Sequence, residues 1–217
     1  MSLFETLSQT REKIQAAATR SNRSGEQITL IAVSKGQPVS KILEVFEAGQ
    51  KHFGENYAQE FLDHEKKITG IWHFIGHLQR NKVKSIVSKV HLIHSVDSLA
   101  LAQEINKQAA AIGKVQPVLV EINLAQESSK TGLSPQEVLS LVQALNDLPH
   151  LDLQGFMTLS SLHFCKLREI RDEINEKKVY KHSLTELSIG MSNDFEEAIE
   201  EGSTMVRIGT GIFGNRE

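Results

Sequence analysis

The sequence contains a single cysteine, Cys165, so no disulfide can form within the chain. It therefore gives no sign of an oxidising compartment. The residues around this cysteine, His163-Phe164-Cys165-Lys166-Leu167, match no signature of a nucleophilic thiol, and we interpret Cys165 as a passive side chain.

Long apolar runs are also missing. No apolar segment approaches the roughly 20 residues that a membrane-spanning helix needs. The start of the chain, Met1 to Glu5, lacks the basic stretch and apolar run of a signal peptide. The net charge of −3 gives no overall attraction to nucleic acid or to an anionic membrane. We therefore expect a cytoplasmic protein with no nucleic-acid and no membrane partner.

No proline-rich linker, low-complexity segment or sharp shift in charge divides the 217 residues. Hydrophobic residues make up 40% of the chain and charged residues 24%, which is ordinary for a soluble globular protein. We expect one domain over residues 1–217.

Strand-like and helix-like patterns alternate along the chain. Residues 28–33 form an apolar, β-branched run, which is typical of a parallel strand buried on both faces. An additional helix is predicted before it, at about residues 3–20, from the helical spacing of its apolar positions. After it, Pro38 opens a helix that ends at Gly49.

The same alternation continues to the end of the sequence. Further strands are predicted at 51–54, 71–75, 91–95, 116–123, 152–157, 185–189 and 204–208, and helices at about 56–67, 79–89, 97–112, 134–147, 165–178 and 193–201. All strands but the last precede a helical segment, which indicates a parallel sheet. Eight such units predict a single (β/α)8 TIM barrel of the α/β class with an extra N-terminal helix. An open doubly wound sheet is the alternative.

Functional residues of such a barrel lie at the carboxyl ends of its strands. Lys35 directly follows the apolar strand at 28–33, where burial of its stem would lower the pKa of the amine and favour its reaction with a carbonyl group. A lysine that extends to solvent is the alternative. After the next strand, Asn56 offers both a donor and an acceptor.

The last two strand ends favour an anion. Strand 185–189 runs into Gly190-Met191-Ser192-Asn193, and Ser192 or Asn193 is expected to cap the following helix. Gly209-Thr210-Gly211 follows the last strand, which contains Arg207. Loops after strands seven and eight are the usual phosphate site of this fold. The pattern G-x-G-x-x-G at 209–214 fails as a dinucleotide motif because no helix and no acidic residue follow at the required spacing.

Two other features have plainer interpretations. His73 and His77 are four residues apart, but on a strand this spacing places them far apart, and no third ligand is suitably spaced, so we expect no metal site. The basic segment 79–89, with Arg80 and Lys84, is interpreted as a solvated helix face, and a surface for a protein partner is the alternative.

Together these residues resemble the pyridoxal 5'-phosphate (PLP) homeostasis proteins, which share the barrel of alanine racemase. The resemblance covers nearly the whole chain. It rests on Ala32-Val33-Ser34-Lys35, Phe53-Gly54-Glu55-Asn56, His73-Phe74-Ile75-Gly76-His77-Leu78-Gln79-Arg80-Asn81-Lys82, Ser129-Lys130-Thr131-Gly132, Gly190-Met191-Ser192-Asn193-Asp194 and Arg207-Ile208-Gly209-Thr210-Gly211-Ile212-Phe213-Gly214.

The resemblance implies that Lys35 holds PLP as a Schiff base. It further implies cofactor-binding roles for Asn56 beside the cofactor, Met157 in the pocket wall, Arg207 at the pyridine nitrogen, and Ser192, Gly209 and Thr210 at the phosphate. The family is cytosolic and is linked to the balance of PLP and amino-acid pools, with PLP-dependent apoenzymes as possible recipients of the cofactor.

Catalysis is expected to be weak or absent. An arginine at the pyridine nitrogen keeps that nitrogen unprotonated and makes the ring a poorer electron sink. In alanine racemases a tyrosine from a second, β-rich domain of the partner subunit supplies a second base, and this sequence ends at Glu217 without such a domain. Its tyrosines are Tyr57 and Tyr180. Without the second domain, a monomer is expected.

Three alternatives stay open at this point. One is a weak PLP-dependent racemase or another amino-acid enzyme. The second is an aldolase-like barrel that acts on a phosphorylated sugar through Lys35, and the third is a scaffold that binds a partner through the basic segment 79–89.

Overall fold

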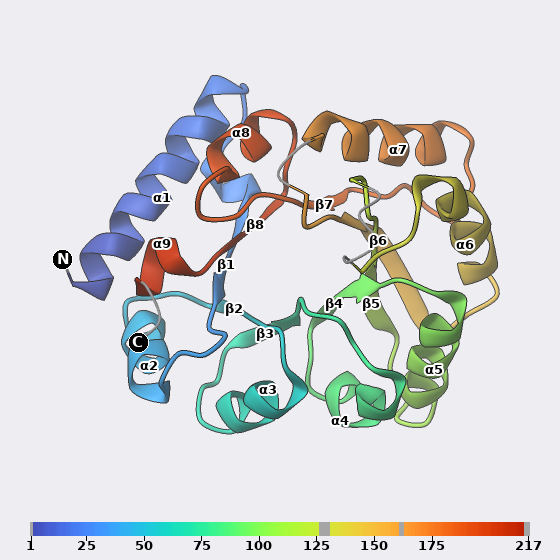
Figure 1. Ribbon diagram of the computed structural model, residues 1–217, viewed down its shortest axis with the longest axis horizontal. Helices are drawn as coiled ribbons and strands as arrows, with labels where there is room; N and C mark the ends of the chain where they lie inside the picture. The colour runs from blue at the N-terminus through green and yellow to red at the C-terminus, as the bar shows by residue number, and fades with distance from the viewer. Residues whose placement is uncertain (1, 126–130, 161–162, 215–217) are drawn as a thin grey trace.

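The computed structural model of the chain describes residues 2–125, 131–160 and 163–214. The quoted residues Ser129 and Lys130, and the chain end Glu217, lie outside these ranges. Within the described residues eight parallel strands close into a barrel in sequence order, and β8 pairs with β1 (Figure 1). The strands are β1 (Thr29–Val33), β2 (His52–Glu55), β3 (Ile71–Phe74), β4 (Leu92–Val96), β5 (Gln116–Glu121), β6 (Leu151–Met157), β7 (Glu186–Ser188) and β8 (Met205–Ile208).

The predicted barrel is therefore confirmed, and an open doubly wound sheet is wrong. Each predicted strand agrees with an observed one to within two residues at either end. The helices around the barrel are α1 (Leu3–Arg20), α2 (Val39–Glu47), α3 (Ala58–Glu65), α4 (Val83–Val87), α5 (Leu99–Ala110), α6 (Val138–Leu145), α7 (Phe164–Glu176), α8 (Phe195–Glu200) and α9 (Thr210–Phe213), with 3-10 turns at Gly25–Gln27, Arg80–Lys82 and Pro135–Glu137.

Two helical predictions need correction. The segment after β8 is not a glycine loop throughout, because Thr210–Phe213 forms the short helix α9. The basic segment 79–89 is not one helix. It consists of the 3-10 turn Arg80–Lys82 and the five-residue helix α4, and no side chain caps either of them.

The N-terminal helix α1 covers the place where the barrel closes. It packs beside α8, α9 and α2, as Figure 1 shows for the blue helix next to the red ones. Because α9 spans only four residues, it cannot cover the outer faces of β8 and β1 by itself. The apolar face of α1, which includes Leu7, Ile14 and Ala18, joins the outer core there and completes the ring of helices.

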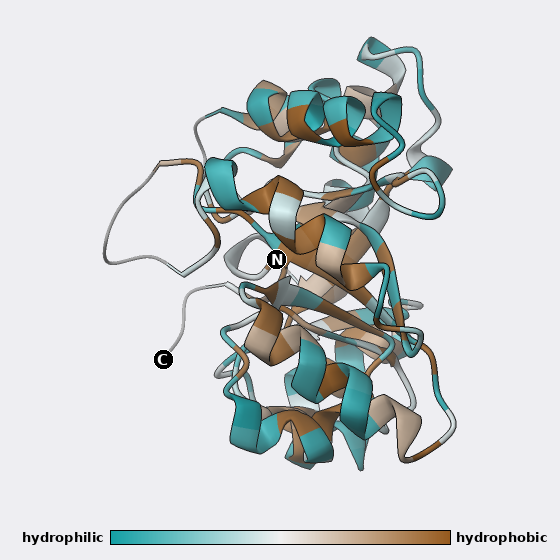
Figure 2. Cartoon of the chain, turned by 90° about the vertical axis from the view of Figure 1, so that its right-hand side faces the viewer, coloured by the Kyte–Doolittle hydropathy of each residue, from teal (hydrophilic) through white to brown (hydrophobic). Residues whose placement is uncertain are grey.

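Two separate groups of buried apolar side chains follow from the alternation of the strands. The larger group lies between the barrel and its helices, whose surfaces show both brown and teal stretches in Figure 2. The smaller group lies inside the barrel and consists of Ile31, Leu92, Leu119, Met157 and Met205. The inner group is small because polar side chains fill the rest of the interior.

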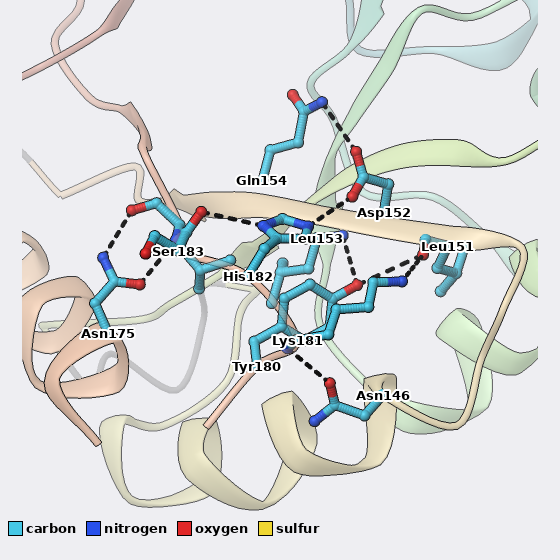
Figure 3. A network of polar contacts seen from close by, with 11 residues as sticks. Asn146, Leu151, Asp152, Leu153, Gln154, Asn175, Tyr180, Lys181, His182 and Ser183 are labelled. Atoms are coloured by element: carbon cyan, nitrogen blue, oxygen red, sulfur yellow. Dashed lines mark hydrogen bonds and ion pairs between the residues drawn. The ribbon is translucent and has the colours of Figure 1, made fainter. Parts of the chain in front are cut away.

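A β-bulge interrupts the pairing of β5 with β6. Val118 lies opposite Leu153, but Leu119 lies opposite Gly155, so Gln154 is one residue extra on β6. The bulge leaves a backbone donor to be satisfied. The amide of Leu153 donates to the buried Tyr180 hydroxyl at 3.1 Å, in the network drawn in Figure 3.

The same network holds the chain between α7 and β7. Lys181 Nζ donates to the Leu151 carbonyl oxygen at 3.2 Å, and its amide donates to Asn146 Oδ1 at 3.0 Å (Figure 3). His182 Nε2 lies 2.9 Å from Asp152 Oδ1. Leu151 is the first residue of β6. Tyr180 therefore lies at the amino end of the barrel, away from the strand ends that carry the predicted site.

We expect Tyr180→Phe to lower the free energy of unfolding by about 1–3 kcal/mol, because the buried Leu153 amide loses its acceptor. The measurement is urea unfolding followed by circular dichroism. The control is His182→Gln, which breaks an exposed contact and should cost under about 1 kcal/mol. Equal losses for the two variants would contradict the role given to Tyr180.

Candidate functional site at the carboxyl end of the barrel

A cavity of about 550 Å³ opens at the carboxyl ends of β1, β2, β3, β7 and β8. We call it the mouth cavity. Its wall is made by Val33, Lys35, Asn56, Ile75, Leu159, Met191, Ser192, Asn193, Asp194, Arg207, Gly209 and Thr210. The structure thus brings together six of the seven predicted site residues. The seventh, Met157, is fully buried in the inner apolar group rather than in the cavity wall.

Lys35 leaves the end of β1 from a well-anchored segment. The preceding Ser34 is buried, and its hydroxyl donates to Glu55 Oε1 at 2.6 Å. The same carboxylate oxygen lies 2.9 Å from His64 Nδ1 of α3. These contacts join β1, β2 and α3 directly beside Lys35. The lysine stem is thereby fixed at its base while the amine extends into the cavity.

Asn56 forms the next part of the wall, and Tyr57 follows it in the chain. A side chain at Gly76 would place its Cβ 2.3 Å from the Asn56 carbonyl oxygen, so the end of β3 lies directly against the Asn56 backbone and needs a glycine there. The Lys35 amine lies 4.9 Å from the centroid of the Tyr57 ring. Tyr57 is thus on the same side of the cavity as Lys35.

The loop after β7 supplies the opposite side. Gly190 has a φ of +95°, and a Cβ there would lie 2.7 Å from Ala198, so only glycine fits this turn. The amide of Met191 donates to Asp194 Oδ1 at 2.6 Å, and Asp194 is the N-cap residue directly before α8. The expectation that Ser192 or Asn193 caps α8 is therefore wrong.

The Ser192 side chain bonds to α9 instead. Its hydroxyl oxygen accepts from the amide of Gly211 in α9 at 3.1 Å, which leaves the hydroxyl proton for a ligand. Gly209 and Thr210 stand at the start of α9, and the first amides of a helix have no acceptor within that helix. Hydroxyl and amide donors therefore meet at one edge of the mouth cavity, where they suit an anion such as a phosphate group.

Arg207 lies at the base of the cavity and is 3% exposed. Its Nη1 donates to the carbonyl oxygen and the hydroxyl of Ser188 at 2.6 and 2.5 Å, and its Nη2 donates to the Thr158 carbonyl oxygen at 2.8 Å. None of these bonds uses Nε. Burial lowers the pKa of the guanidinium to about 10, against the opposing charges of Glu121 and Asp194. Arg207 is therefore a cation at neutral pH.

Below Arg207 the interior is polar. His94, fully buried on β4, places Nδ1 2.9 Å from the Ser188 hydroxyl, and His73 on β3 follows it. Burial lowers the pKa of both histidines well below the ordinary value, and neighbouring positive groups add to the shift. Both rings are neutral at physiological pH.

The remaining candidates lie elsewhere. His77 is exposed and its Nδ1 is 3.2 Å from Asp97 Oδ2, whereas His73 points into the barrel, so the two do not converge. In the described part of the chain no group of three or more His, Cys, Asp or Glu side chains could hold a metal ion. No helix among the described residues is long and apolar enough to span a membrane. Cys165 is exposed.

Sequence reasoning did not assign site roles to Ser188, Thr158 and His94. A signal for His94 was present, since a histidine in the buried run Leu92-Ile93-His94-Ser95-Val96 must find polar partners inside the protein. No local pattern could have identified Thr158, because it contributes its backbone carbonyl oxygen.

Comparison with known proteins agrees with this geometry. The model of the alanine racemase N-terminal domain matches residues 6–217. A solved alanine racemase from Clostridium difficile superposes with a TM-score of 0.75 at 21% identity, over 98% of this chain and 56% of that one. The fold and the position of the cavity thus define a barrel of the alanine racemase N-terminal class.

Relatives of the same length narrow the family. The pyridoxal phosphate homeostasis proteins of Aquifex aeolicus and Escherichia coli K12 are 42% and 43% identical to this chain over 100% and 99% of it, and over 100% and 97% of their own lengths. The structure of PipY from Synechococcus elongatus with PLP bound gives a TM-score of 0.84 at 31% identity, over 98% of this chain and 100% of that one. The chain belongs to the family of pyridoxal phosphate homeostasis proteins.

The buried neutral histidines predict an acid-sensitive fold. In the unfolded chain a histidine has a pKa of about 6.5 and takes up protons below it, whereas His73 and His94 stay neutral in the folded protein. Stability is therefore fully present above about pH 6.5 and falls as the pH drops below it, by up to about 1.4 kcal/mol per pH unit for each histidine.

The check is the free energy of unfolding between pH 7.5 and 5 for the native protein and for His94→Gln. We expect the variant to show the shallower pH slope, whatever its absolute stability, because one group fewer titrates on unfolding. Gln143→Ala, which alters an exposed side chain that does not titrate, serves as the control and should leave the slope unchanged. An unchanged slope in His94→Gln would contradict the assignment.

Proposed function

We propose that this protein binds PLP in the mouth cavity through a reversible covalent bond to Lys35, and that it acts as a carrier in PLP homeostasis with little or no catalysis. The observation that carries this proposal is the convergence of three groups in one cavity. They are the Lys35 amine, the donors of Ser192, Gly209 and Thr210, and the buried guanidinium of Arg207.

The donor set fits the chemical groups of PLP. An aldehyde requires a primary amine, and Lys35 offers one from a fixed base. A phosphate requires hydrogen-bond donors, which the edge formed by Ser192 and α9 supplies. A pyridine nitrogen is an acceptor, and Arg207 faces the cavity as a permanent donor. The cavity volume of about 550 Å³ lies within the range of cofactor pockets.

The relatives support the same cofactor. The Aquifex and Escherichia coli proteins carry PLP homeostasis in their names, and PipY has been solved with PLP bound. In this proposal Asn56 lies beside the cofactor ring, while Met157 supports the floor from below. The cellular setting proposed is the cytoplasm, with PLP-dependent apoenzymes as recipients and a monomer as the working form.

Two features of the cavity favour a carrier over a catalyst. When bound, PLP can stabilise negative charge at the Cα of an amino acid, but it does so best with a protonated ring nitrogen. Arg207 remains charged at neutral pH and therefore favours an unprotonated nitrogen. Racemisation also needs proton-transferring groups on both faces of Cα. Tyr57 lies on the Lys35 side of the cavity, and Tyr180 lies at the amino end of β6.

The proposal is tested by the absorption spectrum of the purified protein after addition of PLP. We expect a near-visible band that borohydride reduction traps as a stable adduct on Lys35, and its loss in Lys35→Ala. Lys66→Ala, which removes an exposed lysine next to α3, is the matched control and should behave like the native protein. A native protein that stays colourless would overturn the proposal and favour a barrel for a phosphorylated sugar.

The carrier role is tested separately by exchange of the Cα hydrogen of amino acids with solvent deuterium, measured by NMR. We expect no rate above that of free PLP with the native protein, because Tyr57 lies on the Lys35 side of the cavity and Tyr180 at the amino end of β6, so neither tyrosine serves the second face of Cα. Rapid exchange that depends on Lys35 would contradict the carrier role and identify a weak PLP enzyme, while leaving PLP binding intact.

A further inference from the structure

A continuous chain of hydrogen-bonded side chains crosses the interior of the barrel. It begins at Arg207, whose Nη1 lies 2.5 Å from the Ser188 hydroxyl. Ser188 Oγ is 2.9 Å from His94 Nδ1, His94 Nε2 is 2.9 Å from His73 Nδ1, and His73 Nε2 is 2.9 Å from His52 Nδ1. The five residues come from five different strands, so the chain links most of the barrel.

This row of hydrogen-bonded side chains ends on the opposite side of the barrel from the mouth cavity. His52, the first residue of β2, is half-buried and lines a second cavity of about 470 Å³. We call it the basal cavity, and its wall also includes Arg11, Glu26, Thr29 and Lys51. A polar path therefore leads from the base of the mouth cavity to the amino end of the strands.

The hydrogen-bond direction follows from the chemistry of the first group. A guanidinium carries donors and no acceptor, so the Ser188 oxygen must accept from Arg207. A neutral imidazole has one donor nitrogen and one acceptor nitrogen. His73 and His94 are neutral, so once one bond of the chain has a direction, every other bond has the same direction.

Two arrangements remain, and they differ at Ser188. In the first, the Ser188 hydroxyl donates to His94 Nδ1, and each histidine carries its proton on Nε2. In the second, each histidine carries its proton on Nδ1, and Ser188 accepts from both His94 and Arg207. The second arrangement leaves the Ser188 proton without an acceptor among the described residues, where its hydroxyl contacts just these two side chains. A buried unsatisfied donor is costly, so the first arrangement is favoured.

We propose that His94, His73 and His52 are positioning residues of the cofactor site, which hold Arg207 through Ser188 by a chain of hydrogen bonds running in one direction to the basal cavity. The role of Arg207 toward the cofactor rests on the proposed function. The direction of the chain and its effect on the guanidinium do not depend on it.

The favoured direction of these hydrogen bonds fixes the position of the Arg207 guanidinium. Because Ser188 donates toward His94, it presents a lone pair to Nη1, while its carbonyl oxygen and that of Thr158 take the remaining bonds. The guanidinium is thereby fixed from one side and keeps Nε free of these three bonds. Loss of His94 would release the Ser188 hydroxyl to rotate and to compete with Arg207 for its acceptors.

Protonation of His52 would oppose the chain. A doubly protonated His52 directs an N–H at the N–H of His73, so the favoured direction cannot persist. Charged and titratable groups face the chain from several elements: Lys51 and His91 beside His52, His91 beside His73, Lys114 beside His91, and Arg207 beside His94, with Arg11 and Glu26 in the basal cavity. Burial, His91 and Lys51 lower the pKa of His52, so this event belongs below about pH 6.5.

The first experiment measures the tautomers of the histidines in the cofactor-free protein by long-range ¹H–¹⁵N NMR near pH 7.5. Signals are assigned by their loss in His52→Gln, His73→Gln and His94→Gln. We expect protonated Nε2 and unprotonated Nδ1 in all three rings. A protonated Nδ1 on His94 in the native protein would overturn the proposed direction, and this result requires neither PLP nor a fully stable variant.

The second experiment asks whether His94 acts through Ser188. In the cofactor-free protein the Nε–H signal of Arg207 is compared in the native protein, Ser188→Ala, His94→Leu and the double variant. We expect each single change to shift the signal, and His94→Leu to add nothing in the Ser188→Ala background. His94→Asn, which restores an acceptor near Nδ1, should return the signal toward its native position. Equal effects of His94→Leu in both backgrounds would identify a merely structural histidine.

The third experiment uses the pH profile of the same Arg207 signal. We expect a transition below about pH 6.5 in the native protein that is absent in His52→Gln and retained in the control His182→Gln. If PLP binds as proposed, its release should also be about ten-fold faster in His94→Leu. Failure to bind PLP would overturn the proposed function alone, whereas an Arg207 signal indifferent to all three histidines would overturn this inference alone.

Discussion

A guanidinium inside a closed barrel must be surrounded by hydrogen-bond acceptors, because an unpaired buried charge is strongly destabilising. In this protein the buried guanidinium is that of Arg207, and residues of neighbouring strands supply its acceptors. Two backbone carbonyl oxygens and a serine hydroxyl take its N–H groups, and that serine in turn contacts His94. Among the described residues, the inner apolar group consists of five buried side chains. The site at the mouth thus depends on polar packing deep in the barrel.

On the other side of the cavity, buried polar contacts also hold the segment that carries Lys35. A buried serine and a buried glutamate hold the segment from which the lysine extends, and His64 of α3 completes the group. The two reactive sides of the cavity are therefore fixed by separate polar clusters. The edge between them carries backbone amide donors and the Ser192 hydroxyl, whose oxygen accepts a hydrogen bond from Gly211 of α9. The amine of Lys35, the buried charge of Arg207 and the hydroxyl and amide donors near α9 come from different strand ends of one barrel.

Much of the fold was accessible from the sequence because the strands of a closed parallel barrel are apolar runs separated by helices. The run at 28–33 and its repeats predicted the number of strands, and the residues near their ends included Lys35, Ser192 and Arg207, which the structure brings to one cavity. The sequence did not reveal the inward or outward direction of each side chain along β6. Met157 was expected in the pocket wall, but it packs inside the barrel with Leu119 and Met205.

Short helices were the other source of error. The stretch 209–214 contains three glycines and reads as a loop, yet the bond from the Gly211 amide to Ser192 and the packing against α1 hold Thr210–Phe213 in a helical turn. Similarly, the cap of α8 could not be chosen among Ser192, Asn193 and Asp194 by residue type alone, because all three are good caps. Ser192 instead bonds to Gly211, nineteen residues away in the chain, and Asp194 occupies the N-cap position.

The bulge at Gln154 determines which side chains of β6 face into the barrel. Before it, Leu151 and Leu153 face the helices; after it, Phe156 does so and Met157 faces inward. An uninterrupted strand would keep one parity along its whole length and would turn the Phe156 ring toward the space beneath the cofactor cavity. The floor of the site is therefore set by the number of residues in β6 as well as by their identity. The extra residue Gln154 shifts the inward positions of β6 by one and so keeps the Phe156 ring in the outer apolar group.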